Sequence, residues 1–352
     1  MKRIFLLLLL LLLSVSLVLA ADTAGKIRVI TDPRPTHDES RAPLHNLVKV
    51  AEISADLEDE YFLVRPWCVR ADNQGNIYVF DLKVRKFFKY DKTFKLIRVF
   101  GNTGQGPGEY APGSSLLMFD IDKNGYLHVI DHMGRKYLKL DGNGQSIEEF
   151  RFQNHSVGPA YPVFDSMGNL FVYHLERNGI SLMSREGEIH HTFLSLQDYA
   201  CSLYRRIPPR MFSLWTSPEP FSTVIRPLPG GRAAVYLMVT STLYLLGDRR
   251  IEKQIRIWPR EQLSHFRKSL SRDNPRIKNS VTFMFMRFFL DNDCAGRFYL
   301  QPPGYRPLLK LDLDGSLIKR LQVPEKAVFH SKRNHLFFAT WEDRVFVLKE
   351  ES

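Results

Sequence analysis

Three ionisable side chains recur at one position of a repeated unit in this sequence. Asp81, Asp131 and His174 each lie six residues after a turn glycine, and His132 follows Asp131 directly. Carboxylate and imidazole groups that meet at a concave surface can bind a divalent metal or act as general acid and base. The spacing also favours a local role, because an arginine stands four residues after each aspartate and an ion pair there would hold the turn together.

Other residue patterns offer little chemistry. His128 and His132 lie four residues apart on an expected strand and its exit, which is a poor indicator of metal ligands. The glycine-rich loop 101–110 is not followed by a helix, so it lacks the helix dipole that supports phosphate binding, and a tight turn explains it better. The sequence has no P-loop, HExxH helix, CxxC pair or nucleophile elbow.

The elements that must position these residues follow a repeat of glycine, arginine, lysine and aspartate. The last three residues follow the glycine at offsets of ten, fourteen and sixteen. Three copies keep these offsets, namely Gly75, Arg85, Lys89 and Asp91; Gly125, Arg135, Lys139 and Asp141; and Gly296, Arg306, Lys310 and Asp312. A period of about 40 to 65 residues that contains only short strands is typical of a β-propeller.

Six copies of the unit can be traced, so we predict an all-β, six-bladed propeller with four-stranded blades. Each copy contains short apolar or alternating segments bounded by Gly, Asn or Asp, which is the pattern of strands. The last copy has Asn334 in place of the glycine and ends one strand short. Residues 47–53 precede the first copy with nothing else to pair with, so we expect them to supply that outer strand and close the ring.

Two motifs resemble those of NHL-type repeats and of the secreted bacterial six-bladed propellers related to them. Residues 72–81 have the pattern Asp-x-x-Gly-Asn-Ile-Tyr-Val-x-Asp, and residues 99–110 have Val-Phe-Gly-x-x-Gly-x-Gly-Pro-Gly-Glu-Tyr. The resemblance implies that the loops entering each innermost strand and those leaving each second strand lie on one face, around the mouth of the central channel. The candidate residues Asp81, Asp131, His132 and His174 would then lie at that mouth.

The N-terminus has the composition of a secretory signal peptide. Two basic residues precede an apolar run, and small residues allow cleavage before Ala21. An uncleaved membrane anchor is the alternative, since the run is almost long enough to span a bilayer. We expect residues 1–20 to be a signal peptide, 21–44 an extension and 45–352 the propeller, in a periplasmic or secreted protein whose mature chain does not span the membrane.

Charge and cysteine content describe the mature chain further. The formal net charge of +11 falls to +9 once the two basic residues of the signal peptide are removed, which favours an anionic partner or surface. Cys68, Cys201 and Cys294 are too few and too scattered to form a disulfide framework. The fold must therefore depend on packing.

Two insertions, at about residues 190–222 and 248–280, interrupt the repeat. Residues 249–278 hold ten Lys or Arg against three acidic residues. Insertions on a regular scaffold are common places for function. We expect a candidate docking surface formed by Arg249, Arg250, Arg256, Arg260, Arg267 and Lys268.

These features favour a non-catalytic binding or scaffold protein of the cell envelope that recognises a protein, peptide or glycan through the channel face or the insertions. We expect no nucleic acid, no resident cofactor or metal, and a monomer. The alternative, implied by resemblance to lactonases and lyases on six-bladed propellers, is a hydrolase or lyase with a divalent metal at the channel mouth.

Overall fold

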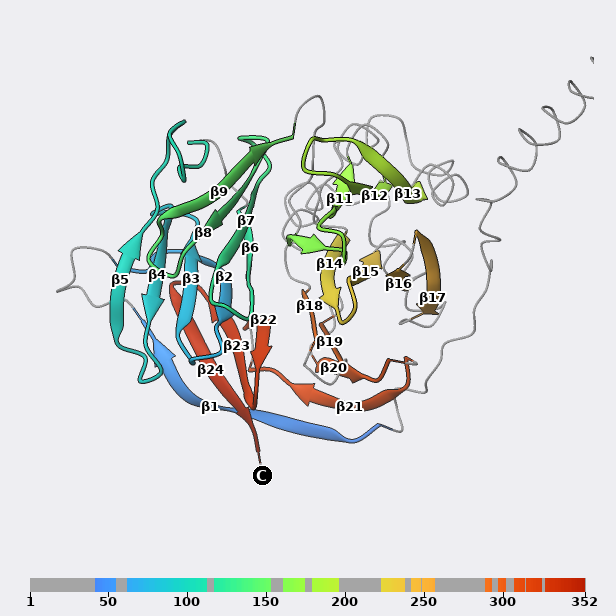
Figure 1. Ribbon diagram of the computed structural model, residues 1–352. Helices are drawn as coiled ribbons and strands as arrows, with labels where there is room; N and C mark the ends of the chain where they lie inside the picture. The colour runs from blue at the N-terminus through green and yellow to red at the C-terminus, as the bar shows by residue number, and fades with distance from the viewer. Residues whose placement is uncertain are drawn as a thin grey trace, which may run out of the picture. The chain divides into compact units, whose positions relative to one another are not determined.

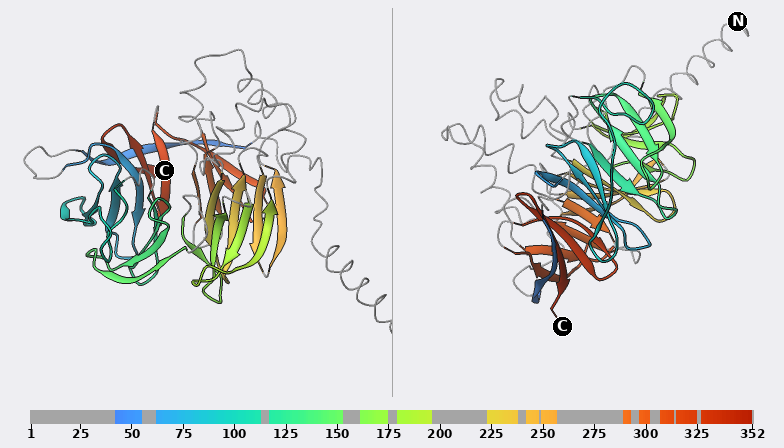
Figure 2. Two further views of the ribbon diagram at one scale, coloured as in Figure 1. Left: turned by 90° about the horizontal axis from the view of Figure 1, so that it is seen from above. Right: turned by 90° about the vertical axis from the view of Figure 1, so that its left-hand side faces the viewer.

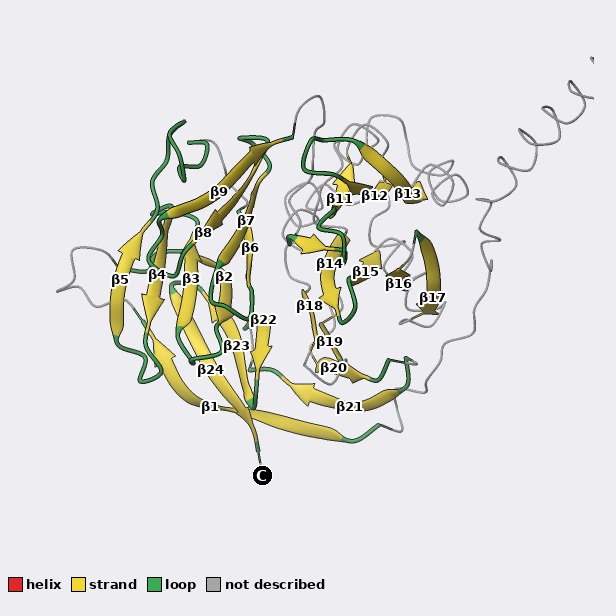
Figure 3. Cartoon of the chain, in the orientation of Figure 1, coloured by secondary structure: helices red, strands yellow, loops and turns green. Residues whose placement is uncertain are grey.

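The computed structural model describes the chain in segments. These are residues 42–54, 62–112, 117–152, 161–174, 179–195, 223–237, 242–247, 249–256, 289–292, 297–301, 307–313, 315–324 and 327–351. They form 24 strands arranged as six blades of four (Figures 1 and 3). The same segments contain no helix, and so none that could cross a membrane. The expected signal peptide at residues 1–20 lies outside them.

Blades one to five are antiparallel meanders whose four strands follow one another in the chain. The first three blades are β2 (Pro66–Ala71), β3 (Ile77–Asp81), β4 (Lys86–Tyr90) and β5 (Leu96–Phe100); β6 (Met118–Ile121), β7 (Leu127–Asp131), β8 (Lys136–Leu140) and β9 (Ser146–Arg151); and β10 (Val163–Phe164), β11 (Leu170–His174), β12 (Gly179–Met183) and β13 (Ile189–Ser195). The next two are β14 (Thr223–Leu228), β15 (Arg232–Leu237), β16 (Thr242–Gly247) and β17 (Arg250–Arg256); and β18 (Phe289–Asn292), β19 (Phe298–Gln301), β20 (Pro307–Leu311) and β21 (Leu317–Gln322).

Blade six takes three strands from the end of the chain and one from its beginning. It consists of β22 (Val328–Arg333), β23 (Leu336–Trp341), β24 (Arg344–Glu350) and β1 (Leu44–Ile53). The first strands of neighbouring blades contact one another around the central axis, where β2 meets β6 and β22, and β14 meets β10 and β18. The chain is therefore a six-bladed β-propeller, as the sequence predicts.

The turn between the first and second strands explains the repeated aspartate and glycine. In blade one, Asp72 Oδ1 accepts the backbone N–H groups of Gln74 and Asn76, each at 2.9 Å. Gly75 has a φ of 87°, in the left-handed region that glycine adopts without steric penalty. Asn334 takes the same place in blade six with a φ of 52°, a conformation that asparagine tolerates better than most residues.

The repeated lysine links one blade to the next. Lys89 Nζ lies 5.3 Å from the ring centroid of Tyr78 and donates a hydrogen bond to the carbonyl of Gly142, in a turn of blade two, at 3.0 Å. The repeated aspartate acts locally, since Asp91 Oδ1 accepts the backbone N–H groups of Thr93 and Lys95. Both repeated residues therefore stabilise turns and blade contacts.

The apolar core lies between neighbouring blades. Phe87 of blade one stacks on Phe100, with ring centroids 5.3 Å apart, and meets Phe119 of blade two edge to face at 5.2 Å. All three rings are buried. Each blade buries its faces only against its neighbours, so the stability of the propeller depends on a complete ring.

Strand β1 closes the ring as predicted and also joins blade five. Residues 47–53 pair antiparallel with β24, from Leu47 opposite Glu350 to Ile53 opposite Val345. The three residues before them pair in parallel with residues 320–322 of β21, which the sequence did not predict. In Figures 1 and 2, β1 runs from the side of β21 to the side of β24. One strand therefore holds two blades together.

The structure corrects the start of both expected insertions. Residues 189–195 form β13 and residues 250–256 form β17, the outer strands of blades three and four. The residues of the two insertions beyond these strands, up to 222 and 280, lie outside the described segments. The outer strand of a blade has one edge and much of its face in water, so its sequence is polar and its strand pattern is faint.

Truncating the chain to begin at Asp56 should lower its stability sharply. The truncation removes β1, whose Leu47 and Ile53 are 5% and 4% exposed, and uncovers the edges of β21 and β24. Burial of one large apolar side chain contributes about 1.5 to 3 kcal/mol, so we expect a loss of several kcal/mol in the free energy of unfolding, measured by urea denaturation. A chain that begins at residue 41 is the control, because it keeps β1. Equal stability of the two chains would contradict closure by β1.

Candidate functional site

Asp81 lies at the end of β3, at the predicted channel face, and its carboxylate is fully buried. Oδ2 accepts the backbone N–H groups of Val64 and Arg65 at 2.7 and 2.6 Å, and Oδ1 accepts those of Lys83 and Val84 at 2.8 and 2.9 Å. The side chain thus fastens the loop that enters β2 to the turn between β3 and β4. In blade one these two loops therefore lie side by side.

The ion pair considered between Asp81 and Arg85 does not form. The oxygens of Asp81 are already occupied by four backbone donors. The repeated arginine acts instead through its backbone: Arg85 donates its N–H to the Asp81 carbonyl at 2.8 Å and has a φ of 57°, and Arg135 has a φ of 50°. The repeat at this position therefore marks a turn conformation.

Asp131 occupies the same place in blade two, at the end of β7. Its buried carboxylate accepts the backbone N–H groups of Ala111 at 2.7 Å and Gly134 at 2.9 Å. His132 follows in the turn and is partly exposed. His174 ends β11, the corresponding strand of blade three, and its side chain lies outside what the structure describes.

Few acidic and imidazole side chains come close together in the part of the chain that the structure covers. No three His, Cys, Asp or Glu side chains there are placed to hold one metal ion. His128 bonds locally, because its Nδ1 is 2.7 Å from the hydroxyl of Tyr137 and its Nε2 is 3.2 Å from Asp122 Oδ2. Cys68 is buried as a free thiol, and Cys201 and Cys294 lie outside the described segments.

A group of polar residues on or just before the first strands, most of them buried, was missed by the sequence analysis. We call Arg70, Asp120, Tyr161, Arg226 and His330 the channel cluster. The first strands of blades one, two, four and six carry four of these residues, and Tyr161 precedes the first strand of blade three. The guanidinium carbons of Arg70 and Arg226 lie 4.3 and 3.3 Å from the ring centroid of Tyr161. These two contacts join blades one, three and four.

Hydrogen bonds tie the channel cluster to the backbone of neighbouring blades. Arg70 Nη1 donates to the carbonyls of Val69 at 2.7 Å and His330 at 3.0 Å, and its Nε is 3.5 Å from Asp120 Oδ1. His330 Nε2 lies 2.7 Å from the hydroxyl of Thr340. The cluster therefore has the bonding of a structural element that fixes the first strands.

The environment of the channel cluster shifts two pKa values. Burial raises the pKa of Tyr161 to about 12, although the neighbouring guanidinium of Arg70 acts against it. Burial holds the pKa of His330 well below its usual value, and the positive charges of Arg70 and Arg226 lower it further. At neutral pH the tyrosine and the histidine are both uncharged.

The same repeat contains the signal that could have revealed the channel cluster. Arg70, Asp120 and Arg226 each lie five residues before the turn glycine, and so does Asp291 on β18. All four occupy the same register, opposite the residue three after that glycine. A search of the position five residues before each turn glycine, instead of six residues after it, would have found these charged residues.

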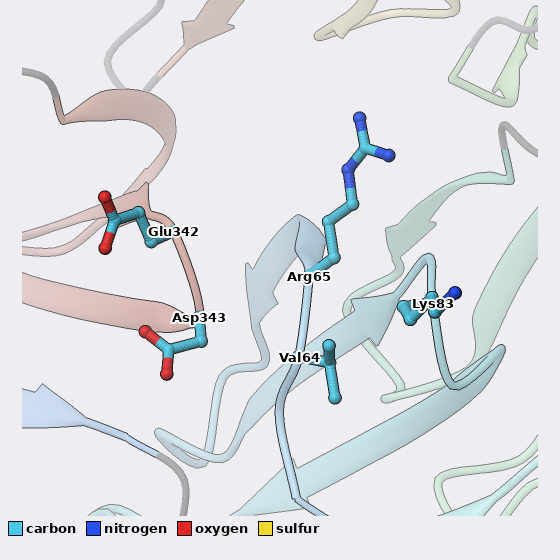
Figure 4. A pocket seen from close by; sticks show the side chains of 5 residues that line it. All are labelled: Val64, Arg65, Lys83, Glu342 and Asp343. Atoms are coloured by element: carbon cyan, nitrogen blue, oxygen red, sulfur yellow. The ribbon is translucent and has the colours of Figure 1, made fainter.

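A cavity of about 360 Å³ lies between blades six and one, at the predicted channel face. Its lining residues are Val64 and Arg65 before β2, Lys83 after β3, and Glu342 and Asp343 between β23 and β24. Figure 4 shows the two acidic side chains on one side and Arg65 and Lys83 on the other. Three of these five residues donate their backbone N–H groups to Asp81. Asp81 therefore fixes the backbone of three residues that line the cavity.

The expected basic docking surface is described only in part. Arg249 and Arg250 are exposed at the hairpin between β16 and β17, and Arg256 ends β17 with its side chain outside the described part. Arg260, Arg267 and Lys268 lie outside the described segments. Elsewhere on this blade, Arg232 pairs with Glu252 at 3.3 Å, which offsets some of the positive charge.

Comparison with known families agrees with the fold. A family model described as DUF5128, a six-bladed β-propeller, matches residues 44–194. No curated protein matches the sequence.

Solved structures of similar fold include three with TM-scores above 0.5. A member of the DUF4221 family from Bacteroides vulgatus has 9% identity and a TM-score of 0.54, over 87% of this chain and 97% of that one. A protein of Bacteroides fragilis described as a candidate exported protein has 12% identity and a TM-score of 0.52, over 88% and 100%. A streptogramin B lyase has 12% identity and a TM-score of 0.51, over 86% and 97%. At these identities the likeness concerns the fold alone.

Replacing Asp81 with Asn should destabilise the propeller. An amide offers one acceptor oxygen where the carboxylate serves four backbone N–H groups, and its NH₂ group would face donors. We expect a loss of about 2 to 4 kcal/mol in the free energy of unfolding, measured in urea. Asp343→Asn is the control, since that side chain is 46% exposed. If the D81N protein were as stable as the D343N protein, the structural role assigned to Asp81 would be wrong.

Acid should weaken the fold through His330. Because its pKa is lowered in the folded state, the unfolded chain binds more protons below a pH of about 6.5, and stability falls as the pH decreases from there. The slope contributed by this group is at most about 1.4 kcal/mol per pH unit. His330→Gln should flatten the slope measured between about pH 7 and pH 5, whereas the exposed His335→Gln should not. An unchanged slope in H330Q would contradict this assignment.

Proposed function

We infer that this protein is a non-catalytic binding protein exported to the cell envelope, which recognises a protein, peptide or glycan through the channel face. The observation that carries this proposal is the cavity between blades six and one. Arg65, Lys83 and Glu342 line it and, in the part of the chain that the structure covers, make no side-chain hydrogen bond or ion pair. Charged groups that the fold does not use are available to a ligand.

The rigidity of the cavity wall also supports binding. Val64, Arg65 and Lys83 are held by one buried carboxylate, so their backbone needs little ordering when a ligand arrives. A pre-organised wall lowers the entropy cost of association. Export is supported by the signal-peptide pattern of residues 1–20 and by the similar fold of the candidate exported protein.

The alternative of a metal-dependent hydrolase or lyase would require Asp81 or Asp131 to serve as a ligand, base or acid. Each carboxylate would first have to release backbone N–H donors that it holds at 2.6 to 2.9 Å. Hydrogen bonds to charged groups contribute about 1.5 to 3 kcal/mol each, so the change would destabilise both loops. The geometry therefore favours positioning roles for these aspartates.

Removing the basic side of the cavity should weaken ligand capture. The purified protein, Arg65→Ala/Lys83→Ala and a matched control Arg249→Ala/Arg250→Ala are applied to arrays of peptides and glycans and to extracted envelope proteins. We expect binding to weaken at least about tenfold in the cavity variant, which corresponds to about 1.4 kcal/mol, and to persist in the control. The control removes the same charge from the expected docking surface on blade four.

Two results would contradict the proposal. If only the Arg249→Ala/Arg250→Ala control lost capture, the ligand would be recognised by the basic surface and not by the cavity. Absence of binding to all three classes by the folded protein would remove the binding role.

A further inference from the structure

The two sides of the cavity come from turns of different blades. Glu342 and Asp343 form the two-residue turn between β23 and β24, which is bounded by the pair of Trp341 and Arg344, and Glu342 has a φ of 54°. Arg65 and Lys83 belong to the two loops that Asp81 fastens together. Both sides therefore have a defined backbone, while the charged ends of the side chains are exposed.

Side chains of opposite charge line the same cavity, and no ion pair joins the acidic side to the basic side in the part of the chain that the structure describes. Glu342, Arg65 and Lys83 form no ion pair among the residues that the structure describes. Asp343 Oδ1 is 3.5 Å from Arg344 Nε, and the same arginine donates through Nη1 to Glu52 at 3.1 Å. The acidic and basic sides are therefore held apart by their turns, and a ligand that carries both charges at its two ends could contact each.

The remaining lining is apolar and the cavity is small. Val64 is 40% exposed between the two sides, and Phe62 is 39% exposed two residues earlier, whereas Leu63 between them is buried. The volume of about 360 Å³ is at the lower end of the range of ligand pockets. A purely anionic ligand would meet two carboxylates and a purely cationic one would meet two basic groups, so the lining selects against both.

We propose that this cavity binds a short peptide with free termini, as a zwitterion. Its ammonium group lies at Glu342 and Asp343, its carboxylate lies at Arg65 and Lys83, and an apolar side chain rests on Val64. The proposal rests on the binding function proposed above and narrows it to one class of ligand.

The test is isothermal titration calorimetry of the full mature chain with the tripeptide Ala-Leu-Ala, its N-acetyl form and its C-terminal amide. We expect the free tripeptide to bind and either cap to weaken the affinity at least tenfold. Glu342→Gln should weaken binding of the free peptide and leave the N-acetyl peptide unaffected, because the ammonium is already absent. Lys83→Met should behave in the same way toward the amide, and Lys349→Met, an exposed lysine outside the cavity lining, should change nothing.

Three outcomes would overturn the proposal. Capped peptides that bind as well as the free one would show that the termini are not recognised. Binding that is insensitive to E342Q and K83M would place the peptide elsewhere, which leaves a peptide-binding function in place. No binding of the tripeptide, together with capture of a glycan or an envelope protein on the arrays, would overturn the ligand class and retain the proposed function.

Discussion

The structure depends on closing the ring. Six blades bury their faces only against one another, and a gap anywhere would expose the apolar faces of two blades. The closure is made by backbone hydrogen bonds of β1, which pairs with β24 in one direction and with β21 in the other. Glu52 reinforces it through Lys49 and Arg344, and these ion pairs hold the pKa of its carboxyl below the usual value. The channel face can be rigid because the ring beneath it is complete.

The channel cluster shows how the centre of such a ring can be polar. Burying a guanidinium is unfavourable unless its charge and its donors are satisfied. Arg70 is placed against the ring of Tyr161, the side chain of Asp120 and two backbone carbonyls. The bonding is directional, so it fixes the positions of the first strands more tightly than an apolar filling would.

The sequence predicted the blades and the closing strand. Those features follow from local rules, since the repeated Asp72, Gly75 and their equivalents each serve a turn within a few residues of themselves. The channel cluster escaped because its members are far apart in the sequence, as Arg70 and His330 are by 260 residues, and meet only once the ring forms. The cavity escaped for the same reason: Glu342 and Lys83 come from opposite ends of the chain, and neither belongs to the repeat.

The position of β1 in blade six also determines when the propeller can close during synthesis. Its partner β24 is made after the strands of the other blades, so a growing chain holds the first strand of the ring long before the strand that it pairs with. The nascent protein cannot complete its propeller until β24 has been made, and contacts between residues some 300 positions apart form slowly. Until β1 and β24 meet, the open chain must be kept from pairing its free strand edges with other chains.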